Sequence, residues 1–247
     1  MNKKPTILAV AALGSLALIG TGFAGWVIVA DATSTASGNI TAYQVTDNRL
    51  TATGKWAGDG ATADSGSIVF GKPSGASDTS STWFKSNDVD EQKLSDTYTL
   101  SIESKNKTDN AEIKVSAKLA ITENKSDPAN TTPYANAVAN NWIKAPTLIR
   151  TDSETDSATD LFESETSSIT LSLSDGTATA EFAFTFAWGS HFEGQNPFTY
   201  YNSKKAKDPI GSTSKTYGED AATVMRALGK INDTQFSIAF TIERANA

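Results

Sequence analysis

The sequence predicts an all-β fold, an antiparallel, jelly-roll-like β-sandwich that carries one or two short helices. Apolar and polar residues alternate along several short segments, which is the pattern of strands that bury one face. Ser, Thr, Asn, Asp and Gly fill the intervals, as expected of polar turns between strands. The chain has 247 residues and no repeat of fixed period, so we expect a single domain.

Short alternating segments are the expected strands. They span residues 38–45, 50–56, 67–70, 97–103, 112–122, 169–173, 177–188 and 234–243. The alternation is clearest in the fifth of these, where Ile113 and Val115 fall on one face and Glu112 and Lys114 on the other. In the last segment the residues expected to be buried are Phe236, Ile238, Phe240 and Ile242.

The centre of the core is expected around residues 177–188, where Phe182, Phe184 and Phe186 share a face. Burying one phenylalanine contributes roughly 1.5–3 kcal/mol, so this segment carries much of the predicted stability. Asp175 and Gly176 precede it, and Asp-Gly is a strong signal for a two-residue hairpin turn. We therefore expect a hairpin between residues 169–173 and 177–188.

The predicted helices are few and short. Residues 134–143 are consistent with one, and residues 89–94 with a single turn. A longer helix is expected to start at Thr216, because Glu219 lies three residues on, the spacing of a capping box, and Gly229 is placed to close it. Its apolar face would consist of Ala221, Val224, Leu228 and Ile231.

The N-terminus has the pattern of an export signal. Two lysines, at positions 3 and 4, precede an apolar run that starts at Ile7. Small residues allow cleavage after Ala24 or after Ala32. Alternatively, residues 7–30 stay as an uncleaved transmembrane anchor, since a helix at about 1.5 Å per residue would cross a hydrocarbon core of about 30 Å. The expected organisation is a signal peptide of residues 1–24 and one β-sandwich domain of residues 25–247.

A family resemblance rests on this region. The run from Ala11 to Ala24, the aromatic residue after it and the segment from Ala36 to Ile40 together resemble the leader of the TasA/camelysin family, and residues 236–243 resemble its end more weakly. The resemblance implies an exported protein of a Gram-positive bacterium, cleaved after Ala24 by a dedicated, SipW-type signal peptidase. It also implies a fibre subunit of the biofilm matrix.

Cleavage after Ala24 would leave a short apolar strand at the new N-terminus. Its residues are Trp26, Val27, Ile28 and Val29, which favour strands and have no partner set by a nearby turn. Such a strand can pair with an edge of its own domain or with a neighbouring subunit, and head-to-tail pairing between subunits propagates a filament. The alternatives are an edge strand within the molecule and a membrane anchor.

Enzymatic activity is not predicted. Cysteine is absent and His191 is the single histidine, so no thiolate site or multi-histidine zinc site can form. Neither Gly-x-Ser-x-Gly nor His-Glu-x-x-His occurs. The metalloprotease activity described for camelysin-type members is therefore not carried over, and His191 is expected to be a surface residue. The net charge of −7 argues against nucleic-acid partners.

One acidic segment has spacing that resembles a calcium-binding loop. Its candidate ligands, at positions 1, 3, 5, 9 and 12 of an EF-hand-like pattern, are Asp152, Glu154, Asp156, Asp160 and Glu163. The glycine that such a loop needs is replaced by Ser157, and the flanks read as strands. The alternative is a plain solvent-facing loop. Apart from calcium, no cofactor is predicted.

A second candidate site is a loop that combines aromatic rings with amides. Its members are Phe192, Gln195, Asn196, Phe198, Tyr200 and Tyr201. Rings beside amides suit stacking on sugars or on another protein. The alternative is that these rings fold back as a lid over the strand that ends at Trp188.

The function that we expect is that of a secreted or cell-surface structural protein, a TasA-like subunit of the extracellular matrix that self-associates into filaments by strand addition. The alternative is a surface module that binds carbohydrate or protein through the aromatic loop. A secreted hydrolase is the least favoured of the three. Contact with a membrane is expected only through the N-terminal segment.

Overall fold

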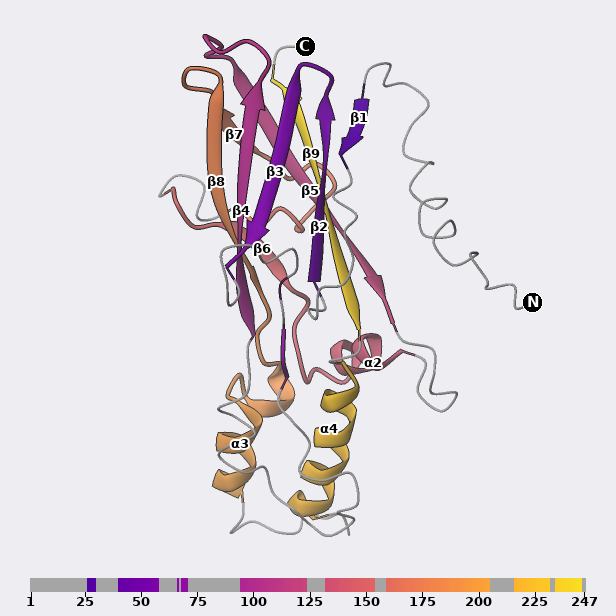
Figure 1. The fold of residues 1–247 in the computed structure, drawn as a ribbon. Coiled ribbons are helices and arrows are strands. Elements are labelled where there is room, and N and C mark those ends of the chain that lie inside the picture. The colour runs from indigo at the N-terminus through magenta and orange to yellow at the C-terminus, as the bar shows by residue number, and fades with distance from the viewer. Residues whose placement is uncertain are drawn as a thin grey trace, which may run out of the picture.

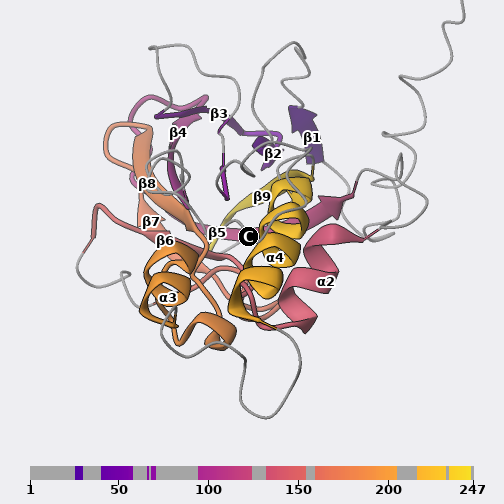
Figure 2. The ribbon, with the colours of Figure 1, turned by 90° about the horizontal axis from the view of Figure 1, so that it is seen from below.

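Two β-sheets packed face to face form the body of the molecule. The computed structural model describes residues 26–29, 40–57, 66, 68–70, 94–123, 132–153, 159–204, 216–231 and 234–245. One sheet has five strands in the order β1-β2-β9-β5-β7, and the other has four in the order β3-β4-β8-β6. The helices gather at one end of the two sheets (Figures 1 and 2). The predicted all-β sandwich is therefore confirmed.

Except for β6, the strands lie close in bounds to those expected. They are β1 (Trp26–Val29), β2 (Ile40–Asp47), β3 (Leu50–Trp56), β4 (Ser95–Ser104), β5 (Glu112–Thr122), β6 (Thr147–Arg150), β7 (Ile169–Ser172), β8 (Thr177–Thr185) and β9 (Gln235–Arg244). The helices are α2 (Pro133–Ala139), the 3-10 turn η1 (Ser190–Phe192), α3 (Pro197–Lys204) and α4 (Tyr217–Ile231).

The core lies between the sheets and is rich in aromatic rings. The four predicted residues of β9, from Phe236 to Ile242, are fully buried, and so are Phe182 and Phe184 of β8. Rings of the two sheets meet directly: Tyr98 stacks on Phe240 with ring centroids 5.3 Å apart. The alternation read from the sequence is thus the alternation of buried and exposed faces.

The pairing of β2 with β9 differs from the expected antiparallel arrangement. These two strands run parallel, from the pair Ile40–Phe236 to the pair Thr46–Ile242. They come from opposite ends of the chain, so no short turn has to connect them, and a parallel pair needs only a long connection. The sheet is therefore mixed rather than purely antiparallel.

The predicted hairpin around Asp175-Gly176 is wrong, although the turn itself is present. Asp175 and Gly176 have φ of 48° and 75°, the left-handed values that this dipeptide favours. However, β7 pairs with β5 in one sheet, while β8 pairs with β4 and β6 in the other. A single bridge, Ser174 to Thr177, joins the two arms. The turn is a corner at which the chain passes from one sheet to the other.

The long helix begins as predicted and ends later. The amide of Glu219 donates to Thr216 Oγ1 at 3.1 Å, and the amide of Thr216 donates to Glu219 Oε2 at 2.9 Å, which is a complete capping box. Gly229 does not close the helix, because α4 continues to Ile231, the last residue of the expected apolar face. Ile231 is fully buried, so its packing favours two further helical residues.

Three short elements were not resolved correctly by the sequence. No element was expected at β6, and α3 was expected to be part of a loop. Residues 67–70 were expected to form a strand, whereas residues 68–70, the described part, belong to no strand of either sheet. The expected turn at 89–94 lies outside the described residues, apart from Leu94.

Within the part of the chain that is described, no helix has the length and apolar character needed to cross a membrane. The expected signal peptide, both cleavage positions and most of the alternative anchor at 7–30 lie outside the described residues.

Candidate functional site

The candidate site is the edge of the five-stranded sheet where β1 lies against β2. The two strands are antiparallel, and their register pairs Trp26 with Asp47 and Val29 with Gln44. β1 is the outermost strand of the sheet (Figure 1). Residues 26–29 therefore pair with an edge of their own domain. This is one of the two pairings considered for an apolar N-terminal strand, the other being with a neighbouring subunit.

β2 offers β1 a well-supported edge. On its other side β2 pairs with β9 along most of its length. The side chains of Gln44 and Thr46 point inward, where they are 2% and 0% exposed. The Gln44 amide donates to Tyr98 Oη, and Thr46 Oγ1 donates to the Leu50 carbonyl at 3.3 Å. Because these buried polar groups have hydrogen-bond partners, a shift of β2 by one residue would expose them and bury the opposite face. The half of β2 that pairs with β1 is therefore held in one position in the sheet.

The edges at β6 and β7 differ from this one. The segment after β6 covers that strand: Leu161 donates its amide to the Leu148 carbonyl at 2.9 Å, and Leu148 donates its own amide to Asp160 Oδ1 at 2.9 Å. Strand β7 pairs with β5 only as far as Val115. From Ser116 onward, β5 has a ladder only with β9 among the strands that the structure describes.

The residues of the acidic loop have other partners. Arg150 Nε binds Asp152 Oδ1 at 2.7 Å, and Asp160 Oδ1 accepts the amides of Leu148 and Phe162. Glu163 is exposed. Glu154 and Asp156 lie outside the described residues, so the complete five-residue set is not in view. Among the residues in view, no three of His, Cys, Asp and Glu are placed to share a metal ion.

The aromatic loop folds back on the core. Phe192 and Tyr201 are fully buried, and Phe192 packs edge-on against Trp188 with ring centroids 5.7 Å apart. Phe198 is partly buried against the core, and Tyr200 packs on Phe192.

Of the two amides in this loop, Gln195 is exposed. Asn196 immediately precedes α3, and its Oδ1 accepts the amide of Thr199 at 2.8 Å. The six residues therefore do not present their rings together on the surface. This is the lid arrangement that the sequence left open.

His191 belongs to a polar cluster at the helical end rather than to a free surface. Its Nε2 lies 3.2 Å from Tyr201 Oη, and that hydroxyl donates to Asp220 Oδ2 at 2.7 Å. The cluster ties η1, α3 and α4 together. Burial raises the pKa of Tyr201, and its hydrogen bond to Asp220 adds to the effect. The sequence held no local signal for this contact, because the three residues are widely spaced.

No protein-family model, curated protein or solved structure matches this chain.

Proposed function

We propose that the protein is an exported structural subunit of the cell surface or extracellular matrix, and that it assembles into filaments by β-strand addition at the β1–β2 edge. The observation that carries the proposal is the position of residues 26–29, which add a short outer strand to the sheet. The leader-like N-terminus and the resemblance of that region to TasA/camelysin proteins support the export and the matrix role.

Assembly requires only that β1 of one subunit pairs with β2 of the next instead of its own. The accepting edge and its register are those seen within one chain. Residues 30–39 connect the two strands, and ten residues extend to at most about 35 Å, enough to reach an adjacent subunit. Because each subunit gives a strand on one side and receives one on another, the contact is heterologous and propagates.

We expect the subunit concentration to determine whether β1 pairs within its own chain or with a neighbouring subunit. The hydrogen bonds between β1 and β2 are the same whether the strand comes from the same chain or from a neighbour. The free energy of exchange is therefore set mainly by linker strain and by new contacts between subunits. Binding in trans gains with subunit concentration, while binding in cis depends on the effective concentration that the linker sets.

A designed disulfide distinguishes the two pairings, because the natural chain has no cysteine. Ile28 lies opposite Val45 in the register. Opposed residues in antiparallel strands have Cα atoms roughly 4.5–5.5 Å apart, within the range that a disulfide bridges. We expect the variant Ile28→Cys/Val45→Cys, starting at Gly25 and oxidised at high concentration, to give covalent ladders on non-reducing gels.

A matched control is the pair Thr51→Cys/Glu103→Cys, which lies opposite across β3 and β4 within one sheet. It should give only disulfides within one chain, and it reports random cross-linking. If the first variant also stays monomeric after oxidation, at concentrations where electron microscopy is used to look for filaments, strand exchange is wrong. An exported form whose measured mass places its start beyond Val29 would contradict the proposal as well.

A further inference from the structure

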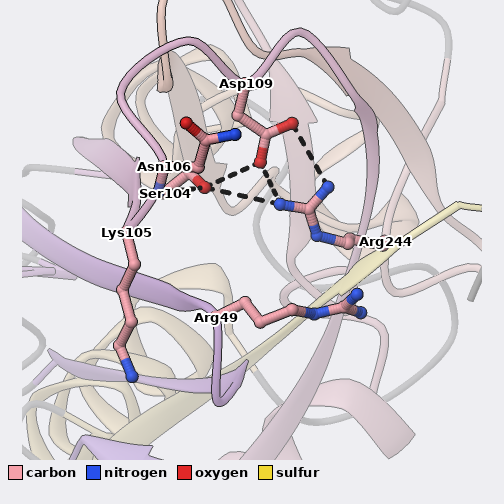
Figure 3. Close-up of a pocket in the computed structure, with 6 residues that line it drawn as sticks. All are labelled: Arg49, Ser104, Lys105, Asn106, Asp109 and Arg244. Atoms are coloured by element: carbon pink, nitrogen blue, oxygen red, sulfur yellow. Dashed lines mark hydrogen bonds and ion pairs between the residues drawn. The ribbon is translucent and has the colours of Figure 1, made fainter.

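Three distant parts of the chain line an open cavity at the end of the sandwich away from the helices. The β2–β3 turn provides one wall, the β4–β5 loop another, and the last residue of β9 a third (Figures 1 and 3). The cavity measures about 310 Å³. Its lining residues are Arg49, Ser104, Lys105, Asn106, Asp109 and Arg244.

Backbone hydrogen bonds fix these walls in place. The Lys105 amide donates to the Arg49 carbonyl at 3.0 Å, which joins the turn to the loop. Gly176, at the corner between the sheets, accepts from the Ser104 amide at 2.7 Å and donates to the Asp109 carbonyl at 2.8 Å. The cavity is therefore formed by backbone that the fold already holds, and a ligand would not have to order a loop.

The acceptors of the cavity are already occupied. Asp109 Oδ1 accepts from the Ala111 amide at 3.1 Å and from Arg244 Nη1 at 3.2 Å. Asp109 Oδ2 accepts from Ser104 Oγ at 2.7 Å and from Arg244 Nη2. Ser104 Oγ in turn accepts from the Asn106 amide at 3.2 Å. A cation or a neutral donor would find little free acceptor capacity here.

Two arginine nitrogens, in contrast, have no acceptor among the residues that the structure describes. Arg244 Nε is buried and has no hydrogen-bond partner among the described residues. Arg49 uses its Nε and Nη2 on Asp47, while Nη1 makes no bond within the described part of the chain. A buried N–H without an acceptor is unfavourable, so the site gains most from a ligand that brings oxygen atoms.

The charges around the cavity agree with this. Its lining holds three cations, Arg49, Lys105 and Arg244, and one carboxylate, Asp109. Asp47 lies outside the lining and compensates part of Arg49. A local positive excess remains in a chain whose net charge is −7. Figure 3 shows the Arg49 guanidinium below the Arg244–Asp109 pair, while the Lys105 side chain extends away from that pair.

We propose that this cavity binds a small oxyanion, a carboxylate or phosphate group, between Arg49 and Arg244. The ligand oxygens accept from Arg49 Nη1 and Arg244 Nε, and Lys105 supplies charge at the rim. The Arg49 side chain is 53% exposed, so it has room to rotate and admit the ligand to the recessed Nε. None of the described lining residues belongs to β1 or β2, and the proposal does not depend on filament formation.

The direct test observes the arginine Nε–H groups by NMR while inorganic phosphate, and in a second sample glucuronate, is added. We expect saturable shifts at Arg49 and Arg244, with a Kd of about 1 mM for the preferred anion. Arg150 and Arg226, the other arginines of the chain, are internal controls and should not shift. The tighter of the two probes shows whether the natural ligand carries phosphate or carboxylate. If neither probe shifts Arg244 saturably, the proposal is wrong.

Substitution on the rim separates a site from general electrostatic attraction. Lys105→Gln and Arg49→Gln should each weaken binding about tenfold, since each removes a charged donor. The matched control is Lys107→Gln, which removes the same charge two residues further along the chain. Lys107 binds Glu103 and is not among the residues that line the cavity. The control should bind as the natural chain does. Equal weakening by Lys105→Gln and Lys107→Gln would overturn the assignment.

Discussion

Arg244 binds Asp109 through both terminal nitrogens of its guanidinium, which joins the last strand to the β4–β5 loop across 135 residues of sequence. The Asp109 side chain is only 8% exposed. The Arg244 hydrogen bonds, followed by that of Ser104, hold the pKa of Asp109 far below its usual range.

This ion pair predicts a loss of stability in acid. The pKa of Asp109 is lower in the folded than in the unfolded chain, so its contribution is complete above an unfolded pKa of about 3.9 and is lost as pH falls below it. We expect Asp109→Asn to lower stability at neutral pH and to flatten the acid dependence. Urea unfolding from about pH 6 to pH 2.5 measures both effects.

Arg244→Lys is the informative companion, because it keeps the charge and loses the paired hydrogen bonds. Its acid dependence should lie between those of the natural chain and Asp109→Asn. If Asp109→Asn leaves the acid dependence of unfolding unchanged, the ion pair between Asp109 and Arg244 is not the cause of that dependence.

Tyr201 predicts a loss of stability in alkali. Burial raises its pKa in the folded chain, so above an unfolded pKa of about 10 the unfolded state releases a proton that the folded state keeps. Stability therefore falls as pH rises through this range. Tyr201→Phe should cost about 1–3 kcal/mol at neutral pH, through the lost bond to Asp220.

The same variant should lose less stability between pH 9 and about 11 than the natural chain does, which denaturant titration at each pH would detect. Parallel curves for the two proteins over that range would show that the phenol of Tyr201 does not contribute.

Gly54 makes room for the Tyr98 ring, so a side chain there should be costly. A Cβ at Gly54 would overlap the Tyr98 hydroxyl and the ring carbon that bears it. Tyr98 cannot move easily, because it is 2% exposed and stacked on Phe240. We expect Gly54→Ala to destabilise the fold by about 1–3 kcal/mol in equilibrium unfolding. The neighbouring exposed Lys55→Ala should change stability by no more than about 0.5 kcal/mol.

A substitution at Thr216 tests how much the capping box contributes to stability. Thr216→Ala removes the acceptor of the Glu219 amide and should cost about 1 kcal/mol. The matched control is Thr223→Ala, the same change inside α4, where the hydroxyl donates back to the Glu219 carbonyl. Alanine favours a helix interior, so the control should be neutral or slightly stabilising. Equal losses in both variants, measured by thermal unfolding, would contradict the capping role.

Local patterns in the sequence predicted the elements, while the pairing of those elements depended on distant contacts. The alternation from Phe236 to Ile242 defined a strand and its buried face, because strand periodicity is a local property. Asp175-Gly176 likewise defined a turn. Whether the strands on either side of that turn pair with each other depends on the sheet to which each strand belongs. The Asp-Gly dipeptide carries no information about that.

The candidate sites divide in the same way. Residues 26–29 were recognisable as a strand from their composition, although their register with β2 was not. The cavity at the far end left no local signature, because Arg49, Asp109 and Arg244 come from three separate turns or strand ends. The contact between His191 and Tyr201 is closer in sequence, but it requires α3, which was expected to be an irregular loop.

The parallel alignment of β2 and β9 has a mechanical consequence. β2 begins at the same end as β9, so a force that pulls the N-terminal side of β2 away from the C-terminal side of β9 acts along the strands and in opposite directions. The hydrogen bonds from the Ile40–Phe236 pair to the Thr46–Ile242 pair are then loaded together in shear, instead of opening one at a time. A domain with this geometry resists stretching between its ends far better than a peripheral hairpin would.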